Sequence, residues 1–419
     1  MEVKMRSLDG IDLQGKKVLL RPDINSPVDP VTKKIVNDNR IVKTIPVIRD
    51  LLDKGAAVAI IAHQGDTLDY QNLVDLHEHA ERLTELLGTK VEYIDDVCGP
   101  AAIARVEALQ PGEVVILGNL RYLTEEVSTF EKDVKLTAEE YTHTWEVRKL
   151  APLFDFYVNE AFSAAHRNSP SMVAFQELLP TAAGPLLFKE YEALYNVLHN
   201  AEKPCVFVLG GAKISDAYGM MRPVLENGTA DAILTTGVTG LVMLYASGVN
   251  VGEKTLKFLA DKDLLGFVDD SKRFLSEFPG KIYMPLDVAV ENDGERMEID
   301  VADMPYDSTY PDIGPKTVAA YTEILNNAKT IFANGPAGVY ENPKFEYGTK
   351  AIWSAIAESP AYSVIGGGDT ISSATKFIDL NKISYVCTGG GAMVRFMSGK
   401  KMPLITAMEK AYERDKAQK

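Results

Sequence analysis

The chain has 419 residues, of which 46% are hydrophobic, and a formal net charge of −15. This length and apolar content are sufficient for two or three domains with large cores. The acidic balance argues against a protein that binds nucleic acid, because such proteins usually carry a basic surface.

Short apolar runs alternate with amphipathic stretches through the first half of the chain. The apolar runs predict five strands, at residues 16–25, 56–65, 90–95, 112–122 and 155–162. Helices are expected between them, for instance at 39–55 and 73–88, each ending at a glycine. This alternation is typical of an α/β fold with a mostly parallel sheet that helices cover on both faces.

A domain boundary is expected after the first set of strands. Pro170, Pro180, Gly184 and Pro185 interrupt the regular pattern, as is typical of a segment between domains. The segment Phe188–Leu198 then places its large apolar residues on one helical face. We therefore expect a first domain over residues 1–180, a linker with a hinge helix over 181–202, and a second α/β domain from residue 203.

Four glycine-rich turns dominate the second half, in the segments 206–213, 330–341, 364–370 and 385–392. Each follows an apolar run, so each is expected where a parallel strand leads into a helix. Glycine lets the backbone approach a ligand there, and the helix start offers N–H groups to an anion. Several such turns at one edge of a sheet predict a socket for a polyphosphate.

The uncharged stretch Ala232–Gly252 is nearly long enough to cross a bilayer, but threonines and glycines divide it. We expect a buried strand followed by a core helix. The three cysteines show no CxxC spacing, and Cys205 and Cys387 lie in or beside apolar runs, which favours buried thiols. Few cysteines, and an N-terminal segment without an apolar signal core, indicate a cytoplasmic protein.

Polar side chains follow the strands of the first half. Their number and position suit a small ligand with phosphate and carboxylate groups, which arginine grips bidentately. The carboxyl ends of parallel strands share one edge, so these side chains could converge. For each arginine alone, a surface charge or a structural ion pair remains an equal alternative. The candidates are Arg21, Asp23, Asn25, Arg40, His63, Arg121 and Arg167.

Three charged residues stand beside the glycine turns of the second half. Lys213 could neutralise a transferring phosphoryl group. Asp369 could hold the metal of a nucleotide, and its alternative role is a helix N-cap together with Thr370. Glu341 could accept hydrogen bonds from ribose hydroxyls, or be a charge at a helix start.

Several common motifs do not occur in the sequence. It contains no GxxxxGK[ST], which excludes a P-loop enzyme, and none of its glycine turns fits GxGxxG/A, which disfavours a dinucleotide-binding dehydrogenase. No GxSxG elbow occurs either. His77 and His79 are two residues apart, on different faces of a helix, and we interpret both as surface residues.

The ordered set of motifs resembles the phosphoglycerate kinase family from Val18 to Gly399. The motifs are RPDIN, NRI, AHQG, NLRY, NEAFSAAHR, LGGAK, NGPAGVYE, GGGDT and TGGGA. Departures from the commonest form of the family make the chain similar to its archaeal branch. Asp66 stands where an arginine would bind substrate, Ala217 where a second lysine is common, and Gly118 where a glutamate would precede NLR.

The resemblance implies reversible phosphoryl transfer between 1,3-bisphosphoglycerate and MgADP, giving 3-phosphoglycerate and MgATP. It also implies two Rossmann-like, three-layer domains that close about a hinge helix. The second domain would span residues 203–398, and the tail, 399–419, would pack back onto the first. The protein would bind neither nucleic acid nor membrane, and would be a monomer or, alternatively, a dimer.

The resemblance further assigns roles by motif match. The phosphoglycerate side would comprise Asp23, Asn25, Arg40, His63, Arg121 and Arg167. The nucleotide side would comprise Gly211, Lys213, Asn334, Pro336, Glu341, Gly367, Gly368, Asp369 and Thr370, with Asp369 on Mg²⁺. Arg40 and Lys213 would flank the transferring phosphoryl group, and the helix starts at Gly367 and Gly390 would add backbone donors. The alternative is a catalytically weak, nucleotide-binding relative with a regulatory role, because Asp66 and Ala217 each remove a positive charge.

Overall fold

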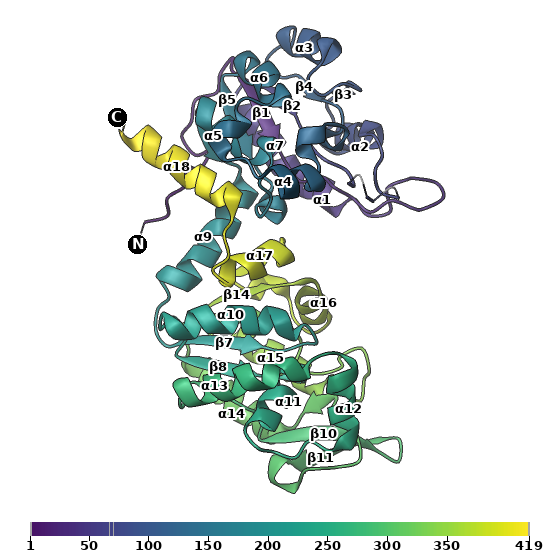
Figure 1. The fold of residues 1–419 in the computed structure, drawn as a ribbon, viewed down its shortest axis with the longest axis vertical. Helices are drawn as coiled ribbons and strands as arrows, with labels where there is room; N and C mark the ends of the chain where they lie inside the picture. The colour runs from purple at the N-terminus through teal and green to yellow at the C-terminus, as the bar shows by residue number, and fades with distance from the viewer. Residues whose placement is uncertain (1, 67, 70, 418–419) are drawn as a thin grey trace. The chain divides into compact units, whose positions relative to one another are not determined.

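The computed structural model describes residues 2–66, 68–69 and 71–417 (Figure 1). The chain forms two compact units. The N-terminal unit comprises Glu2–Glu192 together with the segment from Lys401, and the C-terminal unit comprises Ala193–Lys400. Helix α9 (Pro185–His199) spans the boundary between them.

The N-terminal unit is built on a six-stranded sheet of order β3-β4-β2-β1-β5-β6, in which every pair is parallel. In its register, Leu19 pairs with Ala59 on one side and with Tyr157 on the other. The strands are β1 (Lys17–Arg21), β2 (Ala57–Ile60), β3 (Val91–Tyr93), β4 (Val114–Ile116), β5 (Phe156–Asn159) and β6 (Thr181–Ala183).

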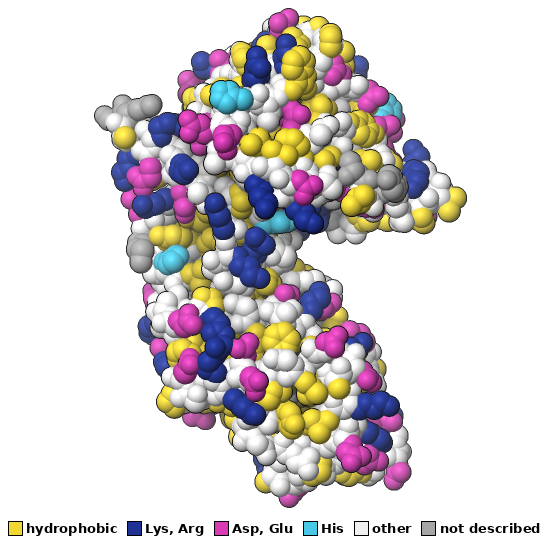
Figure 2. All heavy atoms as spheres, in the orientation of Figure 1, with side chains coloured by type: hydrophobic (Ala, Val, Ile, Leu, Met, Phe, Trp, Pro, Cys, Tyr) yellow, Lys and Arg dark blue, Asp and Glu magenta, His cyan; other side chains and the backbone are white. Residues whose placement is uncertain are grey.

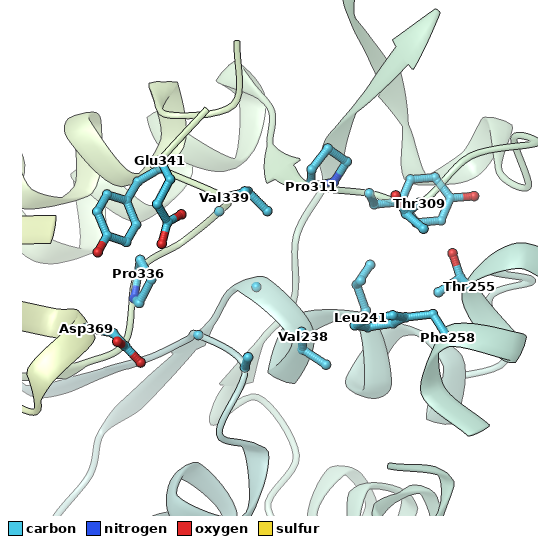
Figure 3. Close-up of a pocket in the computed structure, with 16 residues that line it drawn as sticks. Val238, Leu241, Thr255, Phe258, Thr309, Pro311, Pro336, Val339, Glu341 and Asp369 are labelled. Carbon is cyan, nitrogen blue, oxygen red and sulfur yellow. The ribbon is translucent and has the colours of Figure 1, made fainter. Parts of the chain in front are cut away.

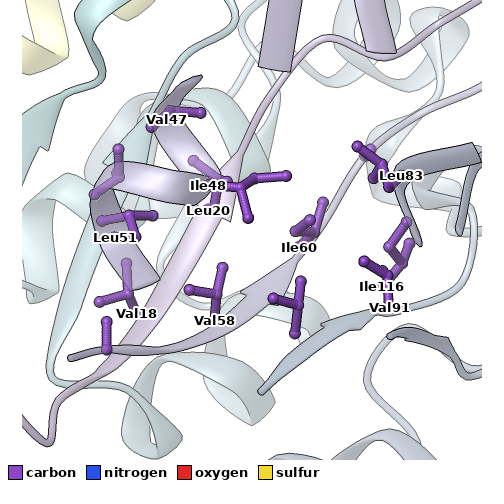
Figure 4. Close-up of a cluster of buried hydrophobic side chains, with 14 of the residues drawn as sticks. Val18, Leu20, Val47, Ile48, Leu51, Val58, Ile60, Leu83, Val91 and Ile116 are labelled. Carbon is purple, nitrogen blue, oxygen red and sulfur yellow. The ribbon is translucent and has the colours of Figure 1, made fainter. Parts of the chain in front are cut away.

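Helices cover both faces of this sheet. They are α1 (Asn39–Asp53), α2 (His77–Leu87), α3 (Pro100–Glu107), α4 (Ser128–Val134), α5 (Ala138–Tyr141), α6 (Trp145–Leu150), α7 (Pro170–Val173), α8 (Phe175–Leu178) and α18 (Pro403–Ala417). Val18 and Leu20 of β1 pack with Ile48 of α1 in one core (Figure 4). On the other face, the ring of Tyr157 stacks on Phe175 of α8, with 5.4 Å between centroids. The alternation of side chains along each strand places apolar residues on both faces.

The C-terminal unit repeats this plan with a parallel sheet of order β15-β14-β13-β7-β8-β9. Its strands are β7 (Cys205–Leu209), β8 (Ala232–Thr235), β9 (Ile282–Tyr283), β13 (Thr330–Asn334), β14 (Tyr362–Gly366) and β15 (Tyr385–Cys387). One face packs on α14 (Pro315–Asn327), α15 (Tyr347–Glu358) and α16 (Gly368–Phe377). Helices α10 (Ile214–Glu226), α11 (Gly237–Ala246), α13 (Val268–Glu277) and α17 (Gly390–Met397) lie on the other (Figure 1). The α/β fold with two mostly parallel sheets is confirmed.

An antiparallel sheet also belongs to the C-terminal unit, and the sequence analysis did not predict it. Its order is β11-β10-β12, from β10 (Asp287–Asn292), β11 (Glu295–Asp300) and β12 (Asp312–Ile313). Val288 and Val290 of β10 pack in a small core with Leu241 and Leu244 of α11. Helix α12 (Glu253–Asp261) contributes Leu256 to the same core.

The uncharged stretch forms β8 and α11, and both are largely buried, as expected. Within the described part of the chain, no helix has the length and apolar character needed to cross a membrane. Cys205 and Cys387 are buried thiols, as predicted. On the visible face, acidic and basic side chains are interspersed (Figure 2).

The prediction for His79 was wrong. Its side chain is buried, and its Nε2 lies 3.1 Å from Oε1 of Gln64. Because His79 and Leu83 are four residues apart, they lie on the same face of α2, and this face packs into the core. His77 is exposed, as expected.

The C-terminal helix α18 packs against α7, α8 and β6 and therefore belongs to the N-terminal unit. Leu404, Ile405 and Met408 are its large buried apolar residues. The hydroxyl of Tyr191 in α9 donates to Glu409 Oε1 at 2.6 Å.

Candidate functional site

Among the polar candidates of the first half, Arg21 is the last residue of β1, and the others lie in the segments that follow β1, β2, β4 and β5. Asp23 and Asn25 follow β1, His63 follows β2, and Arg121 lies in a short 3₁₀ helix after β4 (Leu120–Tyr122). These strands are parallel, so their carboxyl ends share one edge of the sheet. The fold therefore explains how residues about 100 positions apart in sequence come together.

Asp23 anchors Arg40, the second residue of α1. Arg40 Nη1 donates to Asp23 Oδ2 at 2.8 Å, and the hydroxyl of Ser163 also bonds this oxygen. The other carboxylate oxygen, Oδ1, accepts from the backbone N–H of Asn25 at 3.1 Å. Half of the Arg40 side chain remains exposed. Arg40 is thus oriented by an ion pair while its guanidinium stays accessible to a ligand.

His63 lies among the arginines of this cluster. It is 7% exposed, and Arg21 Nη2 lies 3.1 Å from its Nδ1. Arginine can only donate, so Nδ1 is the acceptor and the imidazole proton is on Nε2. Burial lowers the pKa of His63 well below its usual value, and the charges of Arg21, Arg121, Arg40 and Arg167 lower it further. The ring is therefore a neutral donor among cations.

Arg121 and Arg167 differ in accessibility. Arg121 is buried, donates to the backbone carbonyl of Glu126, and has its Nε 4.0 Å from Asp66 Oδ2. Arg167 is about one-third exposed, and its Nη1 lies 3.5 Å from Glu131 Oε2. Asp66, which stands where the family commonly has an arginine, is thus the nearest carboxylate to the Arg121 Nε.

Two buried amide side chains hold these loops together, and the sequence analysis did not assign them a role. Asn119 Oδ1 accepts from the backbone N–H groups of Gln64 and Arg121, at 3.1 and 2.9 Å, while its Nδ2 donates to the carbonyl of Gln64 at 2.8 Å. The Gln64 side chain in turn bonds both backbone groups of Ser26, at 2.8 and 2.7 Å. Gln64 and Asn119 stand in the quoted AHQG and NLRY motifs, which are the signal that could have found them.

In the C-terminal unit the glycine turns pack against one another. A Cβ on Gly335 would lie 2.3 Å from the carbonyl oxygen of Gly210, and Gly335 has φ +88°. Gly211 donates its N–H to the carbonyl of Pro336 at 2.8 Å. Only glycine permits this close approach of the turns after β7 and β13.

The polar candidates of these turns divide into exposed and structural side chains. Lys213 Nζ lies 3.8 Å from Asp369 Oδ2, and both side chains are mostly exposed. By contrast, Asn334 Nδ2 donates to the carbonyl of Gly366 at 2.6 Å, and Thr370 Oγ1 accepts from the N–H of Gly335 at 2.8 Å. Asn334 and Thr370 therefore brace the turns. Asp369 makes no side-chain cap, so its alternative role as an N-cap is not observed.

Two cavities adjoin at these turns. The larger, of about 470 Å³, has an apolar part formed by Val238, Leu241 and Phe258, and it is also lined by Glu341 and Asp369 (Figure 3). The smaller, of about 150 Å³, is lined by Lys213, Asn334, Thr370 and the glycines Gly210, Gly211, Gly335, Gly367, Gly368, Gly390 and Gly391. Gly211, Pro336 and Asp369 line both. An apolar cavity that continues into backbone N–H groups suits a nucleoside with attached phosphates.

Glu341 lies in a turn six residues before α15, so its alternative role as a charge at a helix start is not observed. Phe258 and Thr309, which line the larger cavity, were not candidates. Neither stands in a glycine turn, and only the tertiary fold brings them to the cavity.

The residues present fit a nucleotide-bound Mg²⁺. In the described part of the chain, no cluster of three or more His, Cys, Asp or Glu side chains could hold a metal alone. The exposed carboxylate of Asp369, at the start of α16, lines both cavities. One carboxylate together with phosphate oxygens is the usual protein contribution to Mg²⁺ binding.

The fold and the two clusters define the class of this protein. It is a two-unit α/β protein with a nucleotide-type cavity in one unit and a cluster of arginines around a neutral histidine in the other. The family model described as phosphoglycerate kinase matches residues 8–400. The chain therefore belongs to the phosphoglycerate kinase family.

The relatives of this chain align with it over essentially its full length. A phosphoglycerate kinase from Methanothermus fervidus is 42% identical over 411 residues, covering 98% of both chains. One from Thermococcus onnurineus is 44% identical over 420 residues, again covering 98% of both. Both are archaeal, in agreement with the archaeal character predicted from the sequence. The crystal structure of phosphoglycerate kinase from Pyrococcus horikoshii OT3 superimposes with a TM-score of 0.82 at 39% identity, covering 98% of this chain and all of the other.

Proposed function

We propose that this protein is a phosphotransferase that moves a phosphoryl group reversibly between 1,3-bisphosphoglycerate and ADP, giving 3-phosphoglycerate and ATP. The proposal rests on one observation in a chain that matches the family model from residue 8 to 400. The N-terminal unit holds a cluster of arginines around His63, and the C-terminal unit holds a cavity suited to a nucleotide. A cytoplasmic enzyme that is a monomer or, alternatively, a dimer remains the expectation from the sequence.

The N-terminal cluster would bind the phosphoglycerate. Arg40 and Arg167 are partly exposed and can reach phosphate or carboxylate oxygens. His63, held with its proton on Nε2, would donate one hydrogen bond without adding charge. Asp23 orients Arg40, and the side chain of Asn25, whose Oδ1 accepts from the N–H of Gly65 at 3.1 Å, would donate through its amide. Arg121 would supply a buried positive charge.

The C-terminal cavities would bind the nucleotide. The apolar part beside Leu241 and Phe258 suits a base, and Glu341 would accept from ribose hydroxyls. Gly211, Pro336 and Gly368 line the smaller cavity, which would take the phosphates. Asp369 would hold Mg²⁺, which when bound neutralises charge on the phosphate oxygens.

Phosphoryl transfer here needs positioning and charge stabilisation and no covalent enzyme intermediate. A carboxylate oxygen of 3-phosphoglycerate attacks the γ-phosphorus of ATP, the bond to the β–γ bridging oxygen breaks, and ADP leaves. Arg40 and Lys213 would stabilise the charge on the transferring group, aided by N–H groups at the starts of α16 and α17, near Gly367 and Gly390. Helix α9 would act as the hinge for closure, and closure would exclude water. Small-angle scattering should therefore show a more compact protein with both substrates than with either alone.

The test is ATP-dependent phosphorylation of 3-phosphoglycerate, coupled to NADH oxidation, by wild type and Lys213→Ala. We expect turnover by the wild type and a loss of about a hundredfold in the variant, as is typical when one preorganised group is removed. Lys281→Ala is the matched control, because Lys281 is a partly exposed lysine of the C-terminal unit whose Nζ lies 3.7 Å from Asp231 Oδ1, and neither residue lines either cavity. Binding of ADP without wild-type turnover would contradict the proposal.

A further inference from the structure

We propose that Arg296, on the edge strand β11, is a positioning residue for the nucleoside cavity: its guanidinium fixes the position of two neighbouring wall segments of that cavity. The inference rests on the proposed role of the larger cavity in nucleotide binding. Arg296 itself does not line this cavity.

Two neighbouring chain segments form one side of the larger cavity, opposite Val238, Leu241 and Phe258 (Figure 3). One segment is Thr309–Pro311, which leads directly into β12, and the other is Pro336–Glu341, the turn after β13. The backbone N–H of Val339 donates to the carbonyl of Pro311 at 2.8 Å, which joins the segments at one point. The residues that follow each segment make further contacts with Arg296 of β11.

Arg296 bonds the chain just beyond both wall segments. Its Nη2 donates to the carbonyl of Ile313 at 2.9 Å, two residues after Pro311. Its Nη1 donates to the carbonyl of Lys344 at 3.0 Å, three residues after Glu341. One rigid, planar group therefore links both wall segments to the antiparallel sheet.

Asp312 also connects Arg296 to the wall segment Pro336–Glu341. Arg296 Nη1 donates to its Oδ2 at 2.7 Å, and this oxygen also accepts from the N–H of Gly348 at 2.9 Å. A Cβ on Gly338 would lie 2.4 Å from Asp312 Oδ1, so the carboxylate packs directly against the backbone of a cavity wall. Burial raises the pKa of Asp312 to about 6, while the hydrogen bond from the Gly348 backbone and the charge of Arg296 act in the opposite direction. Without Arg296, the buried carboxylate of Asp312 would lose its cationic partner. The wall segment Pro336–Glu341, which packs against this carboxylate, would then lose its support.

The experiment compares the affinity for ADP, by titration calorimetry, of wild type, Arg296→Met and Arg296→Lys. We expect the Kd for ADP to rise about tenfold or more in Arg296→Met, because small displacements of a binding wall have large effects. The KM for 3-phosphoglycerate should stay within about twofold, since Arg296 touches only the C-terminal unit. Arg296→Lys keeps a charge beside Asp312 but lacks the planar fork, so its Kd should be intermediate.

Arg222→Met is the matched control. Arg222 lies in the same unit, 5.1 Å from the ring of Phe274 and 3.3 Å from Asp270, just as Arg296 lies 5.2 Å from Tyr347. The side chain of Arg222 bonds neither wall segment. Arg222→Met should therefore leave the Kd for ADP unchanged, even if it lowers thermal stability as much as Arg296→Met does.

Three results would overturn the inference. These are a Kd for ADP within twofold of wild type in Arg296→Met, an equal rise in the KM values of both substrates, and full rescue by Arg296→Lys. If Arg296→Met does not fold, the Kd of Arg296→Lys decides. A wild type that binds no ADP would instead contradict the proposed function, so the two failures are distinguishable.

Discussion

At the scale of single residues, burial separates the ionisable side chains of the site into a neutral histidine and exposed cations. His63 is buried among arginines and stays neutral, whereas Arg40 and Lys213 project into solvent with one carboxylate partner each. A chain with a net charge of −15 thus presents cations locally where an anionic ligand would bind.

Arg40→Ala should lower turnover by about a hundredfold or more, because it removes a preorganised donor to the transferring group. The Kd for ADP should not change. Steady-state kinetics and calorimetry measure the two effects separately. Arg49→Ala is the control on the same helix, since Arg49 bonds only the carbonyl of Leu86 in the described structure, at 2.9 Å. Near-normal turnover of Arg40→Ala would contradict the assignment.

His79 should make stability depend on pH on the acid side. Burial lowers its pKa from the usual 6.5 to about 4, so between these values only the unfolded chain takes up the proton. The contribution of His79 is therefore present above pH 6.5 and is lost as the pH falls towards 4. The total loss is about 3 kcal/mol, because one unit of pKa shift corresponds to about 1.4 kcal/mol.

Urea unfolding at a series of pH values measures this dependence. Between pH 6.5 and 4, His79→Gln should lower the slope of the unfolding free energy against pH by up to about 1.4 kcal/mol per pH unit, which corresponds to one proton. The exposed His77, replaced by Gln, is the control. An unchanged slope in His79→Gln would rule out this role.

At the scale of elements, loops from three strands depend on one pair of amide side chains. Asn119 and Gln64 connect the segments after β1, β2 and β4, which carry Asn25, His63 and Arg121. In the C-terminal unit, Asn334 and Thr370 serve the turns after β13 and β14 in the same way. Function at the strand ends therefore rests on buried polar contacts between loops.

Asn119→Ala should cost about 3 kcal/mol or more of stability, because it leaves several buried backbone groups without partners. It should also raise the KM for 3-phosphoglycerate while the Kd for ADP stays constant. Urea unfolding and kinetics check these effects. Asn250→Ala is the control, since Asn250 makes an exposed contact with the N–H of Gly252 at 3.0 Å. A lower stability with no change in KM would limit Asn119 to a structural role.

At the scale of the whole molecule, the chain leaves the N-terminal unit, forms the C-terminal unit and returns through α18. The returning helix buries Leu404, Ile405 and Met408 against α7, α8 and β6. The N-terminal core is therefore completed by the last element of the sequence.

A chain that ends at Lys400 should lose phosphoglycerate binding but keep ADP binding. Burial of three large apolar side chains stabilises by about 5 kcal/mol, which is comparable to the whole stability of a domain. Calorimetry with each substrate separates the two units. Leu404→Ala, which keeps the helix, should lose only about 2 to 5 kcal/mol. Normal phosphoglycerate binding by the shortened chain would contradict this account.

The sequence by itself determined most strands of the two parallel sheets, the glycine turns and the family, because apolar periodicity, glycine-rich turns and ordered motifs are local properties of the chain. It did not indicate β6 or the antiparallel sheet of β10, β11 and β12. Parallel pairing then placed Asp23, His63 and Arg121 at one edge, as expected. Only the tertiary structure decided that His79 is buried, that Asn334 and Thr370 brace turns, and that Arg296 supports a cavity wall. The reason is physical. Those states depend on distances between segments far apart in sequence, and packing sets such distances while local pattern does not.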